Sequence, residues 1–394
     1  MFDFLSYRFS FVTFTVAVTA AVLLVFQFGY YIIVYGKMLS FFKKSKKQTH
    51  DVITDASQCK GVSVIIIANN NGDALRERLI QVLEQEYPLF EVVVVNEHST
   101  DDTEFILYVL KENYSNLKVI NLTENANRFE SRKFSYSIGI RSAKYDTVLI
   151  TDVSCEPKGF DWLSLMMRPV NENSDKEIVT GVCLREKSKG VLNALVKYDE
   201  VTFYTNLIAY TLYGNAYTAC GVNMCYDKDF FTRNGGFIDQ YTNSCNQEDY
   251  FVHRFAHRHN TAVVADMNSV LYLPKYGSAK MFFNVKFATS LSRKVLAFKD
   301  KILLSLFPVC SFLFYAVLIL LLILGFPWQY IVVATVIKWI LHIVYYKKSM
   351  AKFGLKKYWI FSPLTEIYFF FFNFIIRVKV LFYRKKTKKI RWDK

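Results

Sequence analysis

The feature that most constrains this chain is an apolar segment close to its start. Residues 10–36 read SFVTFTVAVTAAVLLVFQFGYYIIVYG and contain no acidic or basic side chain. A run of this length can cross a bilayer as a helix, which satisfies its own backbone hydrogen bonds in lipid. A secretory signal peptide would have a basic start, a shorter apolar core and small residues at a cleavage site. Because the segment has none of these, we expect residues 1–50 to form a transmembrane anchor with a basic juxtamembrane end.

Charge next to this segment predicts its orientation. Five lysines follow it closely, at positions 37, 43, 44, 46 and 47. Lysine and arginine concentrate in cytoplasmic loops, so the chain after residue 37 is expected in the cytoplasm of an inner-membrane, multi-pass protein. The whole chain is 52% hydrophobic and still has a net charge of +15. Nucleic-acid binding is the other interpretation of such a charge. Much of the charge lies beside apolar runs, however, so we expect no nucleic-acid partner.

A helical hairpin is predicted in the last part of the chain, residues 301–394. Its apolar runs, about 303–325 and 328–346, are separated only by Phe326 and Pro327. Lys338 and His342 lie four residues apart in the second run and therefore share a helix face. We expect them to face a neighbouring helix or to reach the interface; a proton or substrate role stays open.

One more apolar segment, about 358–380, is interrupted by Pro363 and Glu366. A full span there would also place the basic C-terminal tail outside, against the usual distribution of positive charge. We expect an interfacial or re-entrant helix. Three spans are predicted, and a fourth stays open.

Residues 51–300 alternate between apolar strands and helices. The predicted strands are 61–68, 90–95, 117–122 and 146–151, and the predicted helices are about 73–85, 101–113 and 130–144. Continuous apolar strands separated by helices are typical of a mostly parallel sheet covered on both faces. The fold class is therefore α/β and Rossmann-like, and a ligand is expected beyond the carboxyl ends of the strands.

Polar residues follow three of these strands. They are Asn69 to Asn71, Asn96 with Glu97, and Asp152. No glycine-rich dinucleotide motif or P-loop appears in the chain. A bound diphosphate would therefore need a divalent cation, for which Asp152 is the natural ligand, or side-chain cations such as Arg132 and Lys133.

The helix after the second strand has its own start signal, STDDTE. Ser99 or Thr100 is predicted to be its N-cap. Asp101 and Asp102 would then lie in the first turn, where acidic side chains favour the helix dipole.

Several motifs in order resemble those of one enzyme family. They are VSVIIIANNN…LIQVLEQEYPLFEVVVVNEHSTDDT, then RKFSYSIGIRSAKYDTVLITDVSCEPKGFDWL, then GVNMCYDKDFFTRNGGF and NQEDYFVHRF. Together they are similar to the family 2 glycosyltransferases of GT-A fold, and to their bacterial membrane-anchored members. The resemblance covers about residues 60–300. It implies transfer of a sugar from a nucleotide-diphosphate donor to an acceptor hydroxyl, usually with inversion.

The resemblance also implies roles for individual residues. The general base would be Asp249, with Glu248 beside it, and Asp152 would take the first position of the Asp-x-Asp metal motif. The expected donor-nucleotide residues are Ala68, Asn70, Asn71, Asn96, Glu97, Lys133 and Asp152. A lipid-linked or membrane-proximal acceptor in envelope glycan synthesis would suit the membrane segments.

This chain departs from the family pattern at the donor site. The nucleoside-reading pair is Asn96-Glu97 rather than two aspartates, Asn71 stands where the family has glutamate, and Ser154 replaces the second metal-binding aspartate. A divalent cation, Mg²⁺ or Mn²⁺, is therefore expected to bind more weakly. The Gln-x-x-Arg-Trp motif of processive members is absent, so one sugar rather than a polymer is expected.

Two functions from different classes remain. The first is an active membrane-bound glycosyltransferase that uses Asp249 as its base. The second is a catalytically impaired domain that binds a nucleotide or a protein partner in an envelope-glycan assembly complex.

Overall fold

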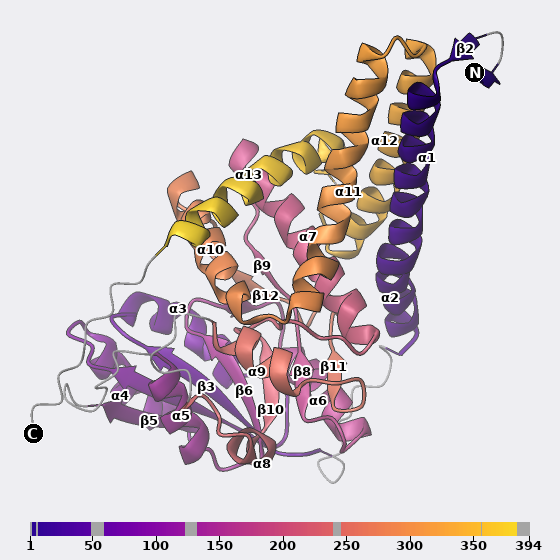
Figure 1. The fold of residues 1–394 in the computed structure, drawn as a ribbon. Helices are drawn as coiled ribbons and strands as arrows, with labels where there is room; N and C mark the ends of the chain where they lie inside the picture. The colour runs from indigo at the N-terminus through magenta and orange to yellow at the C-terminus, as the bar shows by residue number, and fades with distance from the viewer. Residues whose placement is uncertain are drawn as a thin grey trace, which may run out of the picture.

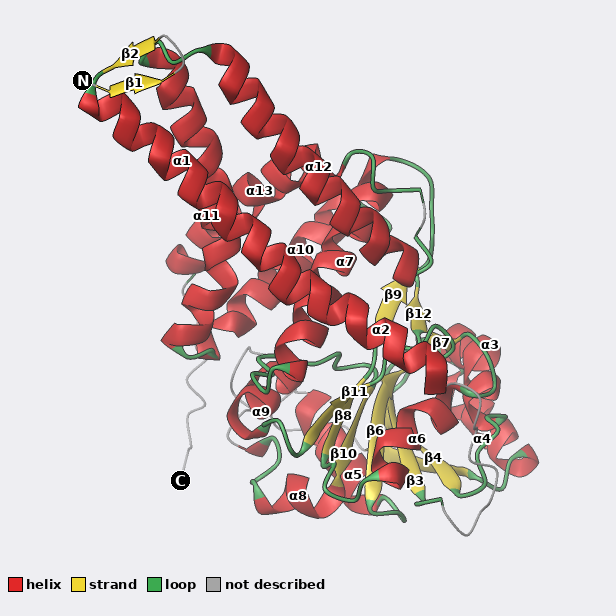
Figure 2. Cartoon of the chain, turned by 90° about the vertical axis from the view of Figure 1, so that its right-hand side faces the viewer, coloured by secondary structure: helices red, strands yellow, loops and turns green. Residues whose placement is uncertain are grey.

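The computed structural model describes residues 2–4, 7–48, 59–122, 132–238, 246–355 and 357–383. Figure 1 shows an α/β domain at one end and a bundle of long helices that extends away from it. A short antiparallel pair, β1 (Phe2–Phe4) and β2 (Tyr7–Phe9), lies at the far end of the bundle (Figure 2).

A seven-stranded sheet forms the centre of the α/β domain, in the order β11-β8-β10-β6-β3-β4-β5. Its strands are β3 (Val62–Ala68), β4 (Phe90–Glu97), β5 (Leu117–Leu122), β6 (Thr147–Asp152), β8 (Ile178–Thr180), β10 (Met224–Asp227) and β11 (Thr261–Val263). The four strands predicted from the sequence are parallel neighbours, and β10 is antiparallel to β6 and β8. The α/β prediction is confirmed.

Helices cover both faces of the sheet. They include α3 (Gly72–Leu83), α4 (Thr103–Asn113), α5 (Arg132–Ser142) and α6 (Trp162–Glu172). Alternate residues of β3 point to opposite sides, so Ile65 and Ile67 join the cluster beneath α5 while Val64 and Ile66 join the one beneath α3. Gly139 lets α5 approach the sheet, since a Cβ there would lie 2.6 Å from the Ile65 side chain.

Further elements lie beyond the carboxyl edge of the parallel strands. A three-stranded sheet consists of β7 (Glu156–Pro157), β12 (Leu271–Leu273) and β9 (Cys183–Arg185). The helices of this region are α7 (Val191–Leu212), α9 (Gln247–Phe255) and α10 (Ala279–Ser292), the last continued by a 3-10 turn (Arg293–Val295). α8 (Lys228–Arg233) lies at the opposite, amino edge, because β10 is antiparallel to β6. α7 packs against both the α/β domain and the helical bundle, and so connects the two parts.

The bundle contains three helices that are long and apolar enough to cross a membrane, within the part of the chain that the structure describes. The first is α1 (Phe11–Tyr30), which continues through a π-helical turn (Tyr31–Tyr35) into α2 (Gly36–Gln48). The others, α11 (Phe298–Ile323) and α12 (Trp328–Lys352), form the expected hairpin. α12 extends beyond its predicted run, which ended at about residue 346. α13 (Ser362–Phe382) runs obliquely beside them and packs on α10 (Figure 1).

Charged side chains inside the bundle contact each other. Lys338 Nζ lies 3.4 Å from Glu366 Oε2 of α13, and His342 Nδ1 lies 3.6 Å from the same atom. Ser311 donates to Glu366 Oε1 at 2.6 Å, and the Tyr31 hydroxyl is 2.6 Å from His342 Nδ1. Lys338 and His342 therefore face neighbouring helices, as expected, and Glu366 is the partner that allows Lys338 to be buried.

Candidate active site

A cavity of about 490 Å³ lies beyond the carboxyl end of β6. It brings Asp152, Lys133 and Arg132 together with Asp249, although the sequence separates the two aspartates by almost a hundred residues. The other expected donor residues do not line this cavity. Ala68 ends β3, Asn96 and Glu97 end β4, and Asn70 and Asn71 lie in the turn after β3. Strand register places Ala68 beside Asn96 and Ile67 beside Asp152, so these strand ends share one edge of the sheet.

Asp249 lies in the first turn of α9 and is only 5% exposed. Its Oδ1 accepts a hydrogen bond from the Thr218 hydroxyl, and its buried Oδ2 has no hydrogen-bond partner among the described residues. Burial raises the pKa of Asp249. The hydrogen bond from Thr218, the positive charge of Arg293 and the nearby Asn246 side chain each lower that pKa. An unpaired carboxylate oxygen with a raised pKa is suited to accept a proton. The side chain of Glu248 lies outside the described residues.

Asp152 ends β6 and is held by two neighbours. Its Oδ1 accepts from the Ser154 backbone N–H at 2.9 Å and from the Ser154 hydroxyl at 2.5 Å. Its Oδ2 lies 3.2 Å from Arg132 Nη1. Ser154, at the second position of the metal motif, thus positions Asp152 instead of adding a second carboxylate.

A divalent cation fits this site only with shared ligands. Within the described residues no group of three or more acidic, histidine or cysteine side chains could hold a metal ion. Mg²⁺ typically binds one or two protein carboxylates and completes its shell with substrate phosphates and water. Asp152 provides one such carboxylate, provided that its hydrogen bonds with Arg132 and Ser154 yield. The residues present therefore fit a cation held jointly with a diphosphate.

Two basic residues at the start of α5 face the same cavity. Arg132 is about half exposed, whereas Lys133 is buried. Arg132 contacts Asp152 and Lys133 lines the same cavity, and both cations could offset the charge of a diphosphate.

The turn after β3 is shaped by asparagine side chains. Asn70 adopts a left-handed conformation with φ of 51°, which asparagine tolerates better than most residues. Its Oδ1 accepts from the Thr100 backbone N–H at 2.8 Å, which joins the turn after β3 to the turn after β4. Asn71 Oδ1 accepts from the Asn69 N–H at 2.9 Å. The turn is therefore held in one shape at the edge where a nucleoside is expected.

Asn96 and Glu97 are turned inward. Asn96 is 3% exposed; its Oδ1 accepts from Ser99 at 2.6 Å and its Nδ2 donates to Asn121 at 3.1 Å. Glu97 accepts a hydrogen bond from the Ser135 hydroxyl of α5. Both side chains thus contact the protein itself, which suits residues that position the turn.

The predicted N-cap of α4 is wrong. The helix begins at Thr103 with Asp102 at the N-cap position, and neither Ser99 nor Thr100 caps it. The Ser99 hydroxyl is instead bound to Asn96, while Asp101 Oδ1 accepts from the Thr103 N–H at 3.1 Å. The nearby polar groups of the strand end compete for Ser99, and local sequence does not reveal such competition.

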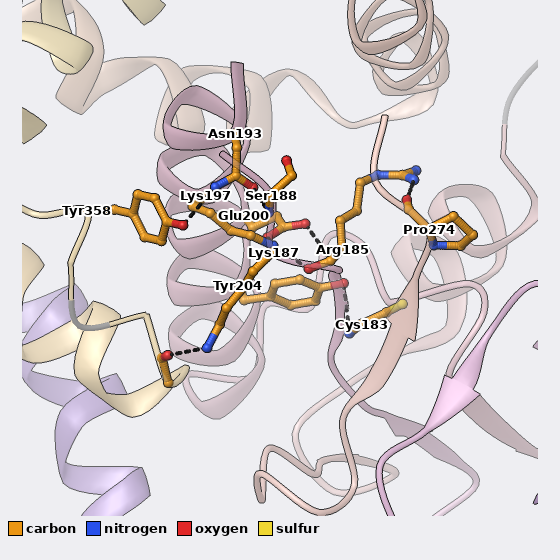
Figure 3. Close-up of polar contacts among 11 residues, drawn as sticks. Cys183, Arg185, Lys187, Ser188, Asn193, Lys197, Glu200, Tyr204, Pro274 and Tyr358 are labelled. Atoms are coloured by element: carbon orange, nitrogen blue, oxygen red, sulfur yellow. Dashed lines mark hydrogen bonds and ion pairs between the residues drawn. The ribbon is translucent and has the colours of Figure 1, made fainter. Parts of the chain in front are cut away.

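The cavity has a second wall that sequence reasoning missed. Arg185 of β9 stacks its guanidinium 3.6 Å from the centre of the Tyr276 ring and donates to the Pro274 carbonyl at 2.7 Å. Glu200 of α7 accepts from the Arg185 backbone N–H at 2.8 Å and pairs with Lys197 at 2.9 Å, as Figure 3 shows. Burial raises the pKa of Glu200, and the charge of Lys197 opposes the rise. This wall therefore brings both charge signs into the cavity that Asp152 lines.

Comparison with protein families identifies the domain. The model of the family described as "Glycosyl transferase family 2" matches residues 63–235. Two bacterial relatives, both named poly-beta-1,6-N-acetyl-D-glucosamine synthase, match shorter segments. The protein of Staphylococcus epidermidis is 28% identical over 130 residues, which is 32% of this chain and 30% of that protein. The protein of Staphylococcus aureus is 26% identical over 98 residues, 25% of this chain and 23% of that protein. The match thus spans less than a third of either relative.

A solved structure has the same fold over most of the chain. The mannosyltransferase PcManGT from Pyrobaculum calidifontis, in complex with GDP-Man and Mn²⁺, superimposes with a TM-score of 0.57 at 18% identity. The superposition covers 90% of this chain and 99% of that one. The resemblance to family 2 glycosyltransferases and the GT-A fold are therefore confirmed.

Proposed function

Because residues 63–235 form a glycosyltransferase family 2 domain, we propose that the protein transfers a sugar from a nucleotide-diphosphate donor to an acceptor hydroxyl. The single observation that supports catalysis best is the shared cavity, in which Asp249 and Asp152 both lie. One carboxylate can serve the acceptor while the other serves the departing diphosphate. An impaired domain that only binds a nucleotide would not require a buried carboxylate with an unpaired oxygen in that cavity.

The proposed reaction is a single displacement. Asp249 Oδ2 accepts the proton of the acceptor hydroxyl, whose oxygen forms a bond with the anomeric carbon of the donor sugar. The bond from that carbon to the diphosphate oxygen breaks, and the electron pair leaves with the nucleoside diphosphate. Attack opposite the leaving group inverts the anomeric centre. A general base contributes about 10²- to 10⁴-fold to such a step.

Charge on the leaving diphosphate is proposed to be balanced by the cavity wall. Arg132 and Lys133 line the cavity together with Asp152, where they can bind phosphate oxygens. A divalent cation, when bound with Asp152 and the diphosphate, supplies further charge neutralisation. Ser154 and Arg132 occupy the Asp152 carboxylate oxygens when no cation is bound, and they would release them for that contact.

Donor recognition is assigned to the ends of β3 and β4 and to the turn after β3. Ala68, Asn70 and Asn71 would contact the base and ribose, with Asn96 and Glu97 positioning the turn from behind. The donor is a nucleotide-diphosphate sugar; the PcManGT complex contains one, GDP-Man.

The acceptor is proposed to be membrane-linked, with the domain on the cytoplasmic side of the inner membrane. Lysines 37, 43 and 44 at the domain end of the first apolar helix support this orientation. Transfer of a single sugar is proposed, because the processive motif is absent from the sequence.

The test is release of nucleoside diphosphate by the purified full chain. GDP-mannose and UDP-N-acetylglucosamine are each incubated with the protein, Mn²⁺ and a bacterial lipid extract, and the products are identified by mass spectrometry. The proposal expects one donor to yield a lipid product heavier by one sugar. Absence of donor binding and turnover with a broader panel of nucleotide sugars would refute it.

A further inference from the structure

A second cavity, of about 670 Å³, lies among the helices of the bundle. Its volume is in the range of ligand pockets, roughly 300–1,000 Å³. α11 and α13 contribute most of its wall, α7 contributes several residues, and α1, the π-helical turn and α12 contribute one each; the lining is mainly aromatic and aliphatic. Two of its polar side chains, Ser311 and Glu366, belong to the network with Lys338. The negative charge of Glu366 is therefore already balanced by Lys338.

The two cavities adjoin at one residue. Asp199 of α7 lines both of them. Its Oδ1 lies 2.6 Å from Nζ of Lys286, a residue of α10 that lines the first cavity. A long ligand in the apolar cavity would therefore have one end at Asp199, next to the cavity that Asp249 lines.

Two arginines lie near this junction. Arg377 of α13 lines the second cavity, and Arg293 is close enough to act electrostatically on both Arg377 and Asp249. Within the described residues, neither arginine forms an ion pair with an acidic side chain. Lys286, by contrast, is neutralised by Asp199. A guanidinium group favours an anionic ligand, and its fork of N–H donors matches a phosphate.

We propose that the second cavity binds the apolar chain of a phosphorylated membrane lipid. Its phosphate would lie near Arg293 and Arg377, and its headgroup would present the acceptor hydroxyl to Asp249. Half of the lining residues, most of them on α11, belong to helices that can cross a membrane, so such a chain can enter from the bilayer. This inference rests on the proposed glycosyltransferase function and names the acceptor class.

Photolabelling of the full chain in nanodiscs tests this site. The probes are a long-chain alkyl phosphate that carries a diazirine and the alcohol with the same chain. We expect the phosphate probe to label peptides of α11 or α13, and to label them about tenfold more strongly than the alcohol. Equal labelling by the two probes would contradict the anionic assignment.

Matched variants locate the chain and the phosphate. Ala316→Trp fills the cavity from α11 and should lower labelling about tenfold, whereas Val332→Trp, on an exposed part of α12 outside the cavity, should not. Arg377→Gln should reduce phosphate labelling to the alcohol level, whereas Lys348→Gln, an exposed lysine outside both cavities, should not. If Ala316→Trp fails to fold, Ile319→Trp of the same wall replaces it. Unchanged labelling in a folded cavity-filling variant overturns the proposal.

A measurement of donor binding distinguishes failure of the lipid site from failure of the proposed glycosyltransferase function. Titration calorimetry with the nucleotide sugar should give the same affinity for wild type, Ala316→Trp and Arg377→Gln. Lost labelling with intact donor binding supports the lipid site. If wild type binds no donor at all, the glycosyltransferase proposal fails, whatever the lipid labelling shows.

Discussion

The Thr218 hydroxyl donates a hydrogen bond to Oδ1 of Asp249, while Oδ2 of the same carboxylate has no partner among the described residues. One oxygen is thus used for orientation and the other is left for chemistry. Because burial raises the pKa of Asp249, the carboxylate is a stronger base than an exposed aspartate. Base strength and orientation together are what removal of an acceptor proton requires.

Replacing Asp249 by asparagine should abolish transfer without loss of the donor. The amide oxygen of the new side chain can still accept the Thr218 hydrogen bond, so the local structure is retained. We expect kcat to fall by about 10²- to 10⁴-fold, with an unchanged dissociation constant for the nucleotide sugar. Initial rates and calorimetry measure the two quantities. Transfer at the wild-type rate would show that another group is the base.

The rate of sugar transfer by the wild-type protein should fall as the pH is lowered. The base must be deprotonated, so the acidic limb of kcat/KM follows the raised pKa of Asp249. Thr218 lowers that pKa by its hydrogen bond. Thr218→Val should therefore move the limb to higher pH, and Thr218→Ser should leave it in place. If the acidic limb of Thr218→Val coincides with that of the wild type, the hydrogen bond between Thr218 and Asp249 does not set the pKa of the base.

The same shift predicts a stability change. A carboxyl group whose folded pKa lies above its unfolded value binds more protons in the folded state between the two values. Stability is therefore lost as the pH rises through that window, and the loss remains at neutral pH. Asp249→Asn should raise Tm at neutral pH by about 2 °C or more and by less near pH 4. Thermal unfolding at the two pH values measures this, and a lower Tm at neutral pH would contradict it.

Restoring the second carboxylate of the metal motif should strengthen the binding of metal. Ser154→Asp adds an acidic ligand two residues from Asp152, so half-maximal activity should need about tenfold less Mn²⁺. Glu156→Gln is the matched control, because Glu156 lies outside the cavity lining and 3.9 Å from Arg78. A Mn²⁺ titration of transfer tests both variants. If Ser154→Asp needs the same Mn²⁺ concentration for half-maximal activity as the wild type, this prediction is wrong.

The asparagine turn offers a backbone test. Asn70→Ala loses the contact with Thr100 and also places an alanine at positive φ, which costs roughly 1–2 kcal/mol. Asn70→Gly loses the contact alone. Alanine should therefore reduce stability and donor affinity more than glycine does. Denaturant unfolding and donor titration of the two variants check this order, and the reverse order would contradict a left-handed Asn70.

Much of the α/β domain follows from local patterns. The β-branched runs predicted β3 to β6 within about two residues, and parallel pairing then placed Asn96 and Asp152 at one edge of the sheet. The convergence of Asp152 with Asp249 had a different source. Only the family resemblance suggested it, since no local pattern relates residues so far apart in the chain.

Other parts of the site could not be predicted locally. Arg185 and Glu200 lie on a three-residue strand and a long helix with no motif, and tertiary packing brings them to the cavity. Glu366 looked like an interruption of an apolar segment, but it is the partner of Lys338 on another helix. Pairing between buried charges becomes visible only when the helices are assembled.

The most direct measurement of the central claim is transfer of labelled sugar into membrane lipid by the wild-type chain and by Asp249→Asn. The account predicts that the wild type yields a lipid product and free nucleoside diphosphate in equal amounts, and that the variant binds the donor but yields neither. Equal product from both proteins, or no donor binding by the wild type, would contradict it.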